Sequence, residues 1–395
     1  MERCDWMAVP KLRFKADDGR DYPELIIAKL DDLCDKIGDG LHGTPIYSKT
    51  GNYYFINGNN LENGKIIVSS DTPKVDDSVF ERNNKKLNDA TILMSINGTI
   101  GKVAYYNDEK VILGKSVAYF KINYKYSKEY YYQLIQTAHV QYQFQKGLTG
   151  TTIKNLGLNT IKNTNVKIPL LPEQQKIAEF LSTIDKIIEK RKETVSAWER
   201  RKKGVMQKLF SQKVRFKVDD GSQFPEWKEK NVEEICSVST GKGNTQDKVN
   251  TGVYRFYVRS PIIEHSDSYL FDEEAVITVG DGVGTGKVFH YVKGKYNLHQ
   301  RCYRMYDFRE VTGEYFYYFF SENFYRRVKS MSAKTSVDSV RMEMITKMKI
   351  LVPCFAEQQK IADCLSSLDE VIEKQKATLA AWEELKKGLL QQMFL

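Results

Sequence analysis

The segment Gly280-Asp-Gly-Val-Gly-Thr-Gly-Lys287 has the glycine content of a loop that binds the phosphates of a nucleotide. The phosphate loop GxxxxGK[ST] needs glycine at position 281 and serine or threonine at position 288, where Asp281 and Val288 stand. The dinucleotide pattern GxGxxG also fails, because Lys287 occupies the place of its third glycine. We therefore predict a strand–turn–strand tip here and no nucleotide-binding loop.

Histidine, cysteine and carboxylate side chains show no spacing that is typical of a catalytic or metal site. The five histidines form no HExxH and no i,i+4 pair, and the six cysteines form no CxxC. No GxSxG motif and no recognisable pair of carboxylates is present. The sequence predicts a chain with no catalytic centre and no bound metal, and its scattered cysteines indicate a reducing, cytoplasmic setting.

Basic side chains point instead to nucleic acid. The chain has 60 Lys and Arg against 51 Asp and Glu, a net charge of +9, together with 24 Tyr and 19 Phe. Several basic residues lie in or beside expected strands and turns, where arginine can meet guanine edges and lysine can meet phosphates. These residues are Lys102, Lys115, Lys154, Arg255, Arg259, Lys287, Arg301 and Arg304. A solvated charged face remains the alternative for each of them.

The elements that would position these side chains follow from an internal repeat. Glu173–Phe210 and Glu357–Phe394 hold the same residue at 22 of 38 positions. Apolar residues recur at three- and four-residue spacing in both copies, and neither copy contains proline. Each copy therefore predicts an amphipathic helix about 55 Å long.

The two predicted helices have matching apolar seams, so we expect them to pack on each other as a coiled coil. Packing of each helix on its own neighbouring domain is the alternative. Arg191 and Gln375 interrupt the two seams at equivalent places, where a polar residue can fix register. The residues expected in the seam or in partner docking are Ile177, Leu181, Ile184, Ile188, Trp198, Ile361, Leu365, Leu368, Ile372 and Trp382.

The repeat extends beyond the helices. Lys11–Glu24 returns as Lys213–Glu226 at an offset of 202, Gly101-Lys102-Val103 matches Gly286-Lys287-Val288 at 185, and Thr151–Ile153 matches Thr335–Val337 at 184. The first half thus carries an insertion of about 17 residues, which we place around Gly38–Gly64. Short apolar runs such as Ala90–Ser95 and Ala275–Val279 predict strands, and Lys128–Gln145 and Gly313–Ser330 predict helices.

The predicted fold is α+β, with two mixed α/β domains separated by two long helices. We expect domains at 1–168 and 213–352, and helices at 169–212 and 353–395. No apolar run reaches the length of a membrane span, and the N-terminus lacks the order of a signal peptide, so we expect a cytoplasmic chain without membrane contact.

This organisation resembles the specificity subunit of type I restriction–modification enzymes. The resemblance is carried by Pro169-Leu-Leu-Pro-Glu-Gln-Gln-Lys-Ile-Ala178 and Pro353-Cys-Phe-Ala-Glu-Gln-Gln-Lys-Ile-Ala362, each opening a repeated helix. Ala356 stands where the first copy has Pro172, a mild departure.

The resemblance implies a non-catalytic DNA-binding subunit. Each variable domain would be a target-recognition domain for one half of a bipartite sequence in double-stranded DNA, with an unread gap. The helices would form an antiparallel coiled coil that spaces the domains and docks two methyltransferase subunits. Those partners bind S-adenosylmethionine, and two further motor-nuclease subunits use ATP and Mg²⁺.

We expect DNA contacts at polar tips between strands, although most such tips could be ordinary turns. In the first half the candidates are Gly40, His42, Thr44, Asn57, Asn59, Asn97, Thr99, Lys102, Lys115, Thr151, Thr152 and Lys154. In the second half they are Lys242, Asn244, Arg255, Tyr257, Arg259, Asp281, Thr285, Lys287, His299, Arg301, Lys334, Thr335 and Ser336.

Two other functions are alternatives to this prediction. A stand-alone methyltransferase–nuclease would need a cofactor-binding glycine loop, an Asn/Asp-Pro-Pro-Tyr/Phe motif or a phosphate loop, and none occurs. A coiled-coil scaffold that does not bind DNA is the remaining alternative. The sequence does not give the bases recognised or the length of the gap, because readout depends on side-chain placement and DNA shape.

Overall fold

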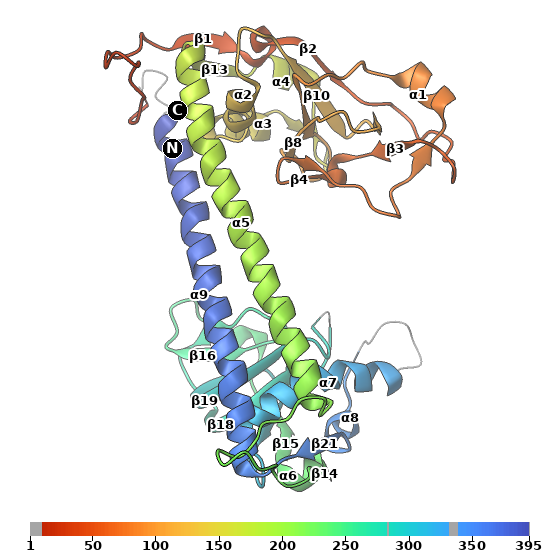
Figure 1. The fold of residues 1–395 in the computed structure, drawn as a ribbon, viewed down its shortest axis with the longest axis vertical. Coiled ribbons are helices and arrows are strands. Elements are labelled where there is room, and N and C mark those ends of the chain that lie inside the picture. The colour runs from red at the N-terminus through yellow and green to blue at the C-terminus, as the bar shows by residue number, and fades with distance from the viewer. Residues whose placement is uncertain (1–9, 283, 332–338, 395) are drawn as a thin grey trace. The chain divides into compact units, whose positions relative to one another are not determined.

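The computed structural model describes residues 10–282, 284–331 and 339–394 (Figure 1). The chain divides into two compact units, Met1–Lys192 with Thr378–Leu395 (unit 1) and Glu193–Ala377 (unit 2). Two long helices, α5 (Leu171–Phe210) and α9 (Phe355–Met393), each contribute one part to either unit. The units therefore cut across the helices, whereas the predicted boundaries kept each helix apart from the domains.

The domain of unit 1 is built on a four-stranded sheet in the order β2-β10-β7-β8 and a three-stranded sheet in the order β6-β3-β9. Its central strand β7 is buried along its whole length, and the run that predicted it is confirmed. The strands are β1 (Ile26–Lys29), β2 (Cys34–Asp39), β3 (Tyr53–Ile56), β4 (Leu61–Glu62), β5 (Lys65–Ile66), β6 (Lys74–Val75), β7 (Thr91–Ser95), β8 (Val103–Tyr105), β9 (Val111–Leu113), β10 (Val117–Ile122), β11 (Leu148–Thr149), β12 (Asn155–Leu156) and β13 (Asn165–Ile168). The helices are α1 (Asp77–Asn83), α2 (Lys128–Leu134), α3 (Ala138–Lys146) and α4 (Leu158–Lys162).

The domain of unit 2 uses one six-stranded sheet in the order β15-β20-β18-β19-β16-β17. Its long strand β19 pairs antiparallel with β18 and parallel with β16. In unit 1 the equivalent pairings are made by two separate strands, β8 with β7 and β9 with β3. The strands are β14 (Lys228–Asn231), β15 (Ser237–Thr240), β16 (Tyr254–Tyr257), β17 (Glu264–Ser266), β18 (Phe271–Val279), β19 (Phe289–Leu298), β20 (Cys302–Tyr306) and β21 (Lys349–Val352). The helices are α6 (Val232–Ile235), α7 (Gly313–Met331) and α8 (Met342–Thr346).

Strand pairing identifies equivalent residues in the two units and corrects the place of the insertion. Ile56 pairs with Leu113 as Tyr257 pairs with Leu298, so the offset is still 201 (257 − 56) at the end of β3. Thr91 pairs with Lys121 as Ala275 pairs with Tyr306, so the offset has fallen to 184 (275 − 91) at β7. The insertion therefore lies between residues 57 and 90, where unit 1 adds β4, β5 and α1, and not at 38–64.

Strand pairing also shifts one sequence match. Val103 pairs with Met94, and Phe289 pairs with Thr278 at the equivalent place. The predicted match of Val103 with Val288 is thus one residue out of register, because the tip between β18 and β19 is longer than the tip between β7 and β8.

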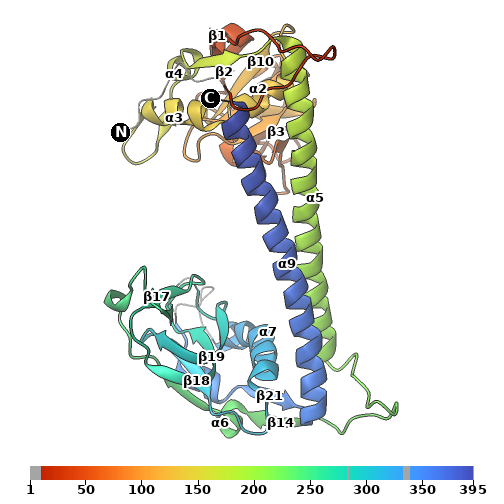
Figure 2. The same ribbon diagram turned by 90° about the vertical axis from the view of Figure 1, so that its left-hand side faces the viewer.

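One predicted helix is divided in two. The segment Lys128–Gln145 forms α2 and α3. The first helix ends at Leu134, and the Thr137 side chain caps the start of α3 by accepting a hydrogen bond from Val140 N. The corresponding segment of unit 2 remains the single helix α7, which lies beside β18 and β19 (Figure 2). Its Phe320 and Phe324 rings pack against Phe289 of β19.

The long helices lie side by side and antiparallel within each unit (Figures 1 and 2). In unit 1, Ile177, Leu181 and Ile184 of α5 share a core with Leu379, Trp382 and Leu389 of α9. In unit 2, Val205, Met206 and Leu209 of α5 share a core with Ile361, Leu365 and Leu368 of α9. The same two cores contain domain residues such as Tyr130 and Tyr315, so the helices pack on each other and on their domains together.

Eight of the ten predicted seam residues belong to these two cores, and Trp198 and Ile372 are not among them. Ile177, Leu181, Ile184, Ile188, Ile361, Leu365 and Ile372 are buried, and Trp198, Leu368 and Trp382 are half-buried. Ion pairs flank the seam at equivalent places: Lys192 lies 3.0 Å from Glu383 in unit 1, and Lys376 lies 3.1 Å from Glu199 in unit 2. Antiparallel packing of a duplicated helix requires such reciprocal pairs.

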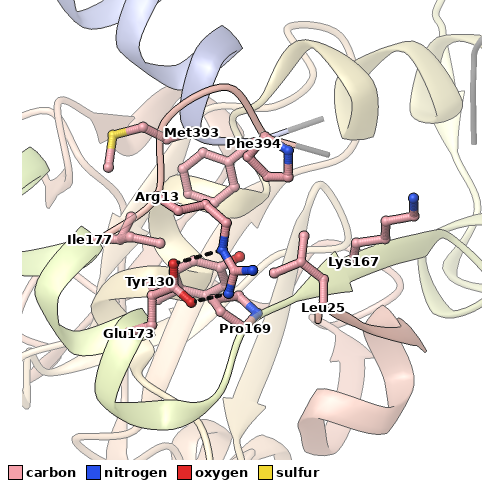
Figure 3. Close-up of a pocket in the computed structure, with 10 residues that line it drawn as sticks. Arg13, Leu25, Tyr130, Lys167, Pro169, Glu173, Ile177, Met393 and Phe394 are labelled. Carbon is pink, nitrogen blue, oxygen red and sulfur yellow. Dashed lines mark hydrogen bonds and ion pairs between the residues drawn. The ribbon is translucent and has the colours of Figure 1, made fainter. Parts of the chain in front are cut away.

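A buried ion pair fastens the start of α5 to the segment before β1 (Figure 3). Glu173 is 1% exposed and accepts hydrogen bonds from Arg13 Nε at 3.1 Å and Arg13 Nη2 at 2.5 Å. The pair borders a cavity of about 10 Å³ whose wall also includes Tyr130 and Phe394. A space of this size holds at most a single water, so the cavity is a packing feature of the frame.

Unit 2 repeats this ion pair at the start of α9. Glu357 is fully buried and accepts hydrogen bonds from Arg215 Nε at 3.1 Å, from Arg215 Nη2 at 2.8 Å and from Trp227 Nε1 at 2.8 Å. The glutamate of the repeated Glu-Gln-Gln-Lys-Ile-Ala segment is thus a structural anchor of both helices. A buried carboxylate needs such partners to offset its lost hydration.

Candidate nucleic-acid interface

The polar tips of unit 1 gather around one cleft of about 670 Å³. Its walls come from the ends of β2, β3, β7 and β9 and from the segment after β11. The lining residues are Asp39, His42, Asn57, Gly58, Asn59, Ile96, Asn97, Gly98, Lys115, Ser116, Ile153, Asn155, Leu156, Gly157 and Leu158. The structure thus brings together predicted residues from four separate tips.

Backbone and side-chain hydrogen bonds hold the cleft walls in place. Gly58 N donates to Ser116 Oγ at 2.9 Å, and that hydroxyl donates to Asn57 Oδ1 at 3.0 Å. Asn97 pairs with Asn155 as an isolated antiparallel bridge. The cleft is therefore formed by tied strand ends, and its amide side chains are positioned before any ligand arrives.

The cleft wall combines neutral polar side chains with charged and apolar ones. His42 Nε2 lies 2.6 Å from Asp39 Oδ2, and Lys115 is exposed beside them. Asn97 Oδ1 is buried and has no hydrogen-bond partner among the described residues. Asparagine amides carry both donors and acceptors, which suits them to the edges of bases.

The other predicted residues of unit 1 belong to the same tips but do not line the cleft. Thr44, Thr99, Thr151, Thr152 and Lys154 are exposed, and Lys102 is half-buried. Among the lining residues that were not predicted, Ser116 and Asn155 carry neutral polar side chains. Each directly follows a predicted residue in the sequence, but only the tertiary structure shows that it lines the cleft.

The corresponding tips of unit 2 meet at a cluster of three charged residues. Arg259 Nη1 donates to Asp281 Oδ1 at 3.3 Å, and Arg301 Nη1 donates to Asp281 Oδ2 at 2.6 Å. Partial burial would raise the pKa of Asp281, but hydrogen bonds from Arg301 and Arg259 outweigh it and lower that pKa below its ordinary value. The cluster keeps one net positive charge on the surface.

Neighbouring exposed polar side chains extend this surface, and the buried His299 lies beneath them. Gln300 Nε2 donates to Asn244 Oδ1 at 2.8 Å, and His299 Nε2 lies 3.4 Å from Thr245 Oγ1. Burial, reinforced by Arg259 and Arg301, lowers the pKa of His299, which favours its neutral form. Lys242, Asn244, Arg255 and Lys287 are exposed, with the Lys287 ammonium 5.2 Å from the Tyr325 ring centre.

The prediction of a direct DNA contact is wrong for four residues, because they are buried: Gly40, Tyr257, Thr285 and His299. Tyr257 and His299 are 1% and 5% exposed, and Tyr257 packs against His290 and Tyr296 in the core. Thr285 is 3% exposed and donates to Gly282 O. A Cβ on Gly40 would lie 2.3 Å from Leu113 O, so this glycine permits close backbone approach. These residues support the tips from beneath.

Two further predictions have definite outcomes. The segment Gly280–Lys287 joins the antiparallel strands β18 and β19, so the strand–turn–strand prediction is confirmed. Arg304 is enclosed between the Phe271 and Tyr306 rings and paired with Glu273, so its predicted role at a base edge is wrong. Lys334, Thr335 and Ser336 lie outside the described residues.

The two surfaces occupy equivalent places in the repeat but differ in chemistry. Strand register matches Gly58 with Arg259, Asn97 with Asp281 and Ser116 with Arg301. The bridge from Asn97 to Asn155 likewise matches the bridge from Asp281 to Ser339. At these three positions, the shared frame presents neutral groups in unit 1 and a charged cluster in unit 2.

A duplicated frame with two different strand-end surfaces also agrees with comparison to known proteins. The family model for the type I restriction modification DNA specificity domain matches residues 26–197 and 225–381. The chain belongs to the type I restriction–modification specificity subunit family. Its two matched segments correspond to the two halves of the repeat.

Individual members of this family show moderate likeness. The type I restriction enzyme MjaVIII specificity subunit of Methanocaldococcus jannaschii is 23% identical over 65% of this chain and 68% of its own length. The EcoDI specificity subunit of Escherichia coli is 27% identical over 42% of this chain and 36% of its own length, so the match spans about a third of that relative. The crystal structure of the S subunit from M. genitalium has a TM-score of 0.62 at 17% identity, covering 98% of this chain and 99% of that one.

The described residues contain neither a membrane-spanning helix nor a candidate metal site. No helix within 10–282, 284–331 or 339–394 is long and apolar enough to cross a membrane. Over the same residues, no group of three or more His, Cys, Asp or Glu is placed to hold a metal ion.

Proposed function

We propose that this specificity subunit reads a bipartite target in double-stranded DNA, with each domain reading one half. The main support is that three positions at equivalent strand ends differ in charge between the units. Unit 1 has Gly58, Asn97 and Ser116 there, and unit 2 has Arg259, Asp281 and Arg301. The frame repeats its buried anchors, Arg13–Glu173 and Arg215–Glu357, but not its surface residues. Two half-sites of different sequence follow from this difference.

The chain itself carries out no chemistry in this proposal. It acts with two methyltransferase subunits, which hold S-adenosylmethionine, and with two motor-nuclease subunits, which use ATP and Mg²⁺. Phe180 and Leu385 are large apolar side chains on α5 and α9 that are 40% and 48% exposed, and they support docking of a partner on the helices. A complex that modifies chromosomal DNA would act in the cytoplasm.

The test is methylation mapping of DNA from cells that express this chain with its cognate methyltransferase subunit. The expected result is adenine methylation at a split motif with two unlike halves and a fixed gap. Exchange of residues 228–352 for those of a relative should change one half only. These limits are suitable because β14 and β21 pair from Lys228–Val352 to Asn231–Lys349 and close the domain.

A matched exchange of residues 26–168, which β1 and β13 close in the same way, should change the other half of the motif. If an assembled complex shows no sequence-specific methylation, the specificity role is wrong and a scaffold that does not bind DNA becomes the better description. A contiguous motif would contradict the division of labour between the domains.

A further inference from the structure

The cluster of Arg259, Asp281 and Arg301 is arranged for a ligand that offers acceptors and a donor together. Each arginine donates one hydrogen bond from Nη1 to Asp281, and its other N–H groups make no hydrogen bond among the described residues. The side chains of Arg259 and Arg301 are 46% and 59% exposed, whereas that of Asp281 is 22% exposed. The two guanidinium groups are thus held in a fixed orientation and remain accessible to a ligand.

Three tips far apart in sequence bring these groups together at fixed strand ends. Arg259 follows β16, Asp281 follows β18, and Arg301 precedes β20. Gly280 N donates to Arg301 O at 2.9 Å, which ties two of the tips through their backbones. A Cβ on Gly280 would lie 2.6 Å from Arg301 O, so the two tips are in close backbone contact.

The central carboxylate separates two possible ligands. A DNA phosphate offers only acceptors and carries a negative charge, so Asp281 would oppose its approach. A G·C base pair offers the N7 and O6 acceptors of guanine and the N4 amino donor of cytosine in the major groove. Two arginines beside one carboxylate match that pattern, since arginine donates to guanine and a carboxylate accepts from cytosine.

We propose that Arg259, Asp281 and Arg301 form the reader of a G·C base pair in the half-site of unit 2, with Asp281 aligning the two arginines. The inference rests on the proposed function and adds the base pair and the residues that select it. The equivalent positions of unit 1, Gly58, Asn97 and Ser116, lack all three charges, so unit 1 does not read G·C in this way.

The test begins with the methylated motif mapped for the full chain and its methyltransferase subunit. Duplexes that carry this motif, and duplexes with each base pair of it changed in turn, are then competed for binding to the assembled complex. Arg259→Lys and Arg301→Lys keep the charge but remove the fork that guanine needs. Each should cut the preference for one G·C pair by roughly 5- to 150-fold, while the dependence of affinity on salt stays the same.

Asp281→Asn distinguishes base reading from a simple basic patch. If Asp281 aligns the arginines, this substitution lowers the preference for the same G·C pair. If the cluster only holds phosphates, loss of the negative charge strengthens binding to every duplex by a similar factor and changes no preference. Arg326→Ala, which removes an exposed arginine on α7, is the control and should leave the motif unchanged.

The outcomes separate the two levels of the proposal. A split motif that the lysine variants and Asp281→Asn all leave unchanged overturns the reader while leaving the proposed function in place. Relaxation of a position in the half-site assigned to unit 1 overturns it as well. Absence of any sequence-specific motif rejects the proposed function itself.

Discussion

The ammonium group of Lys202 lies 2.5 Å from Asp369 Oδ1, and Lys386 lies 2.6 Å from Asp185 Oδ1 at the equivalent place in unit 1. Each pair joins α5 to α9 within its own unit. Each carboxylate also accepts a hydrogen bond from its domain, from Tyr318 Oη at 2.9 Å or from Gln133 Nε2 at 2.7 Å. In each half of the repeat, one carboxylate thus links α5, α9 and the domain.

Lys202→Met should therefore destabilise the helix pair by about 1 kcal/mol, because a partly buried, hydrogen-bonded ion pair contributes more than an exposed one. Chemical denaturation would measure the change. The swap Lys202→Asp with Asp369→Lys should recover part of the loss. Equal stability of all variants would show that the ion pair contributes nothing.

Removal of the buried glutamate at the start of α9 should be far more costly. Glu357→Ala leaves Arg215 without its buried partner and Trp227 Nε1 without its acceptor, so we expect a loss of about 3–5 kcal/mol. Glu226→Ala is a suitable control, because Glu226 is a largely exposed partner of Arg215 and should cost less than about 1 kcal/mol. Similar losses for both variants would contradict the anchoring role.

Replacement of a polar group in the helix seam should raise the free energy of unfolding, in contrast to the two substitutions above. Gln375 Oε1 is buried and has no hydrogen-bond partner among the described residues. Gln375→Leu should raise the free energy of unfolding by about 1–2 kcal/mol, since an unsatisfied buried acceptor is replaced by an apolar group of similar length. Gln391→Leu, at an exposed position of the same helix, should give no gain in the same denaturation experiment.

His290 should make unit 2 sensitive to mild acid. Burial lowers the pKa of His290 from its ordinary 6.5, and its Nε2 has no partner among the described residues. The unfolded chain therefore binds a proton more readily than the folded one, so this stability is complete above pH 6.5 and falls as the pH drops below it. His290→Phe should flatten the decline of melting temperature between pH 6.5 and 5, whereas the exposed His265→Gln should not.

Lys115 tests the electrostatic part of DNA binding. It is exposed at the edge of the unit 1 cleft, where we expect a phosphate contact. Lys115→Ala should weaken binding to all duplexes alike and reduce the slope of log affinity against log salt by about 1. Lys125→Ala, an exposed lysine away from the cleft, should leave the slope unchanged, and a change at one motif position only would instead make Lys115 a base reader.

The sequence by itself determined the repeat, the two long helices and the family. These depend on local properties, because apolar periodicity and proline-free composition over some forty residues define a helix wherever it lies. The likeness of Glu173–Ala178 to Glu357–Ala362 is evident from the sequence alone. The structural role of the two glutamates is not, because each pairs with an arginine, Arg13 or Arg215, more than a hundred positions away.

The tertiary structure decided which polar residues share a surface. Arg259, Asp281 and Arg301 are separated by some twenty residues each, and only the register of β16, β18 and β20 places them around one carboxylate. Packing on both faces of β16 buries Tyr257 as well as its neighbour Phe256, and the turn between β9 and β10 brings Ser116 to the cleft wall. Both outcomes depend on contacts between segments distant in the sequence, which composition does not encode.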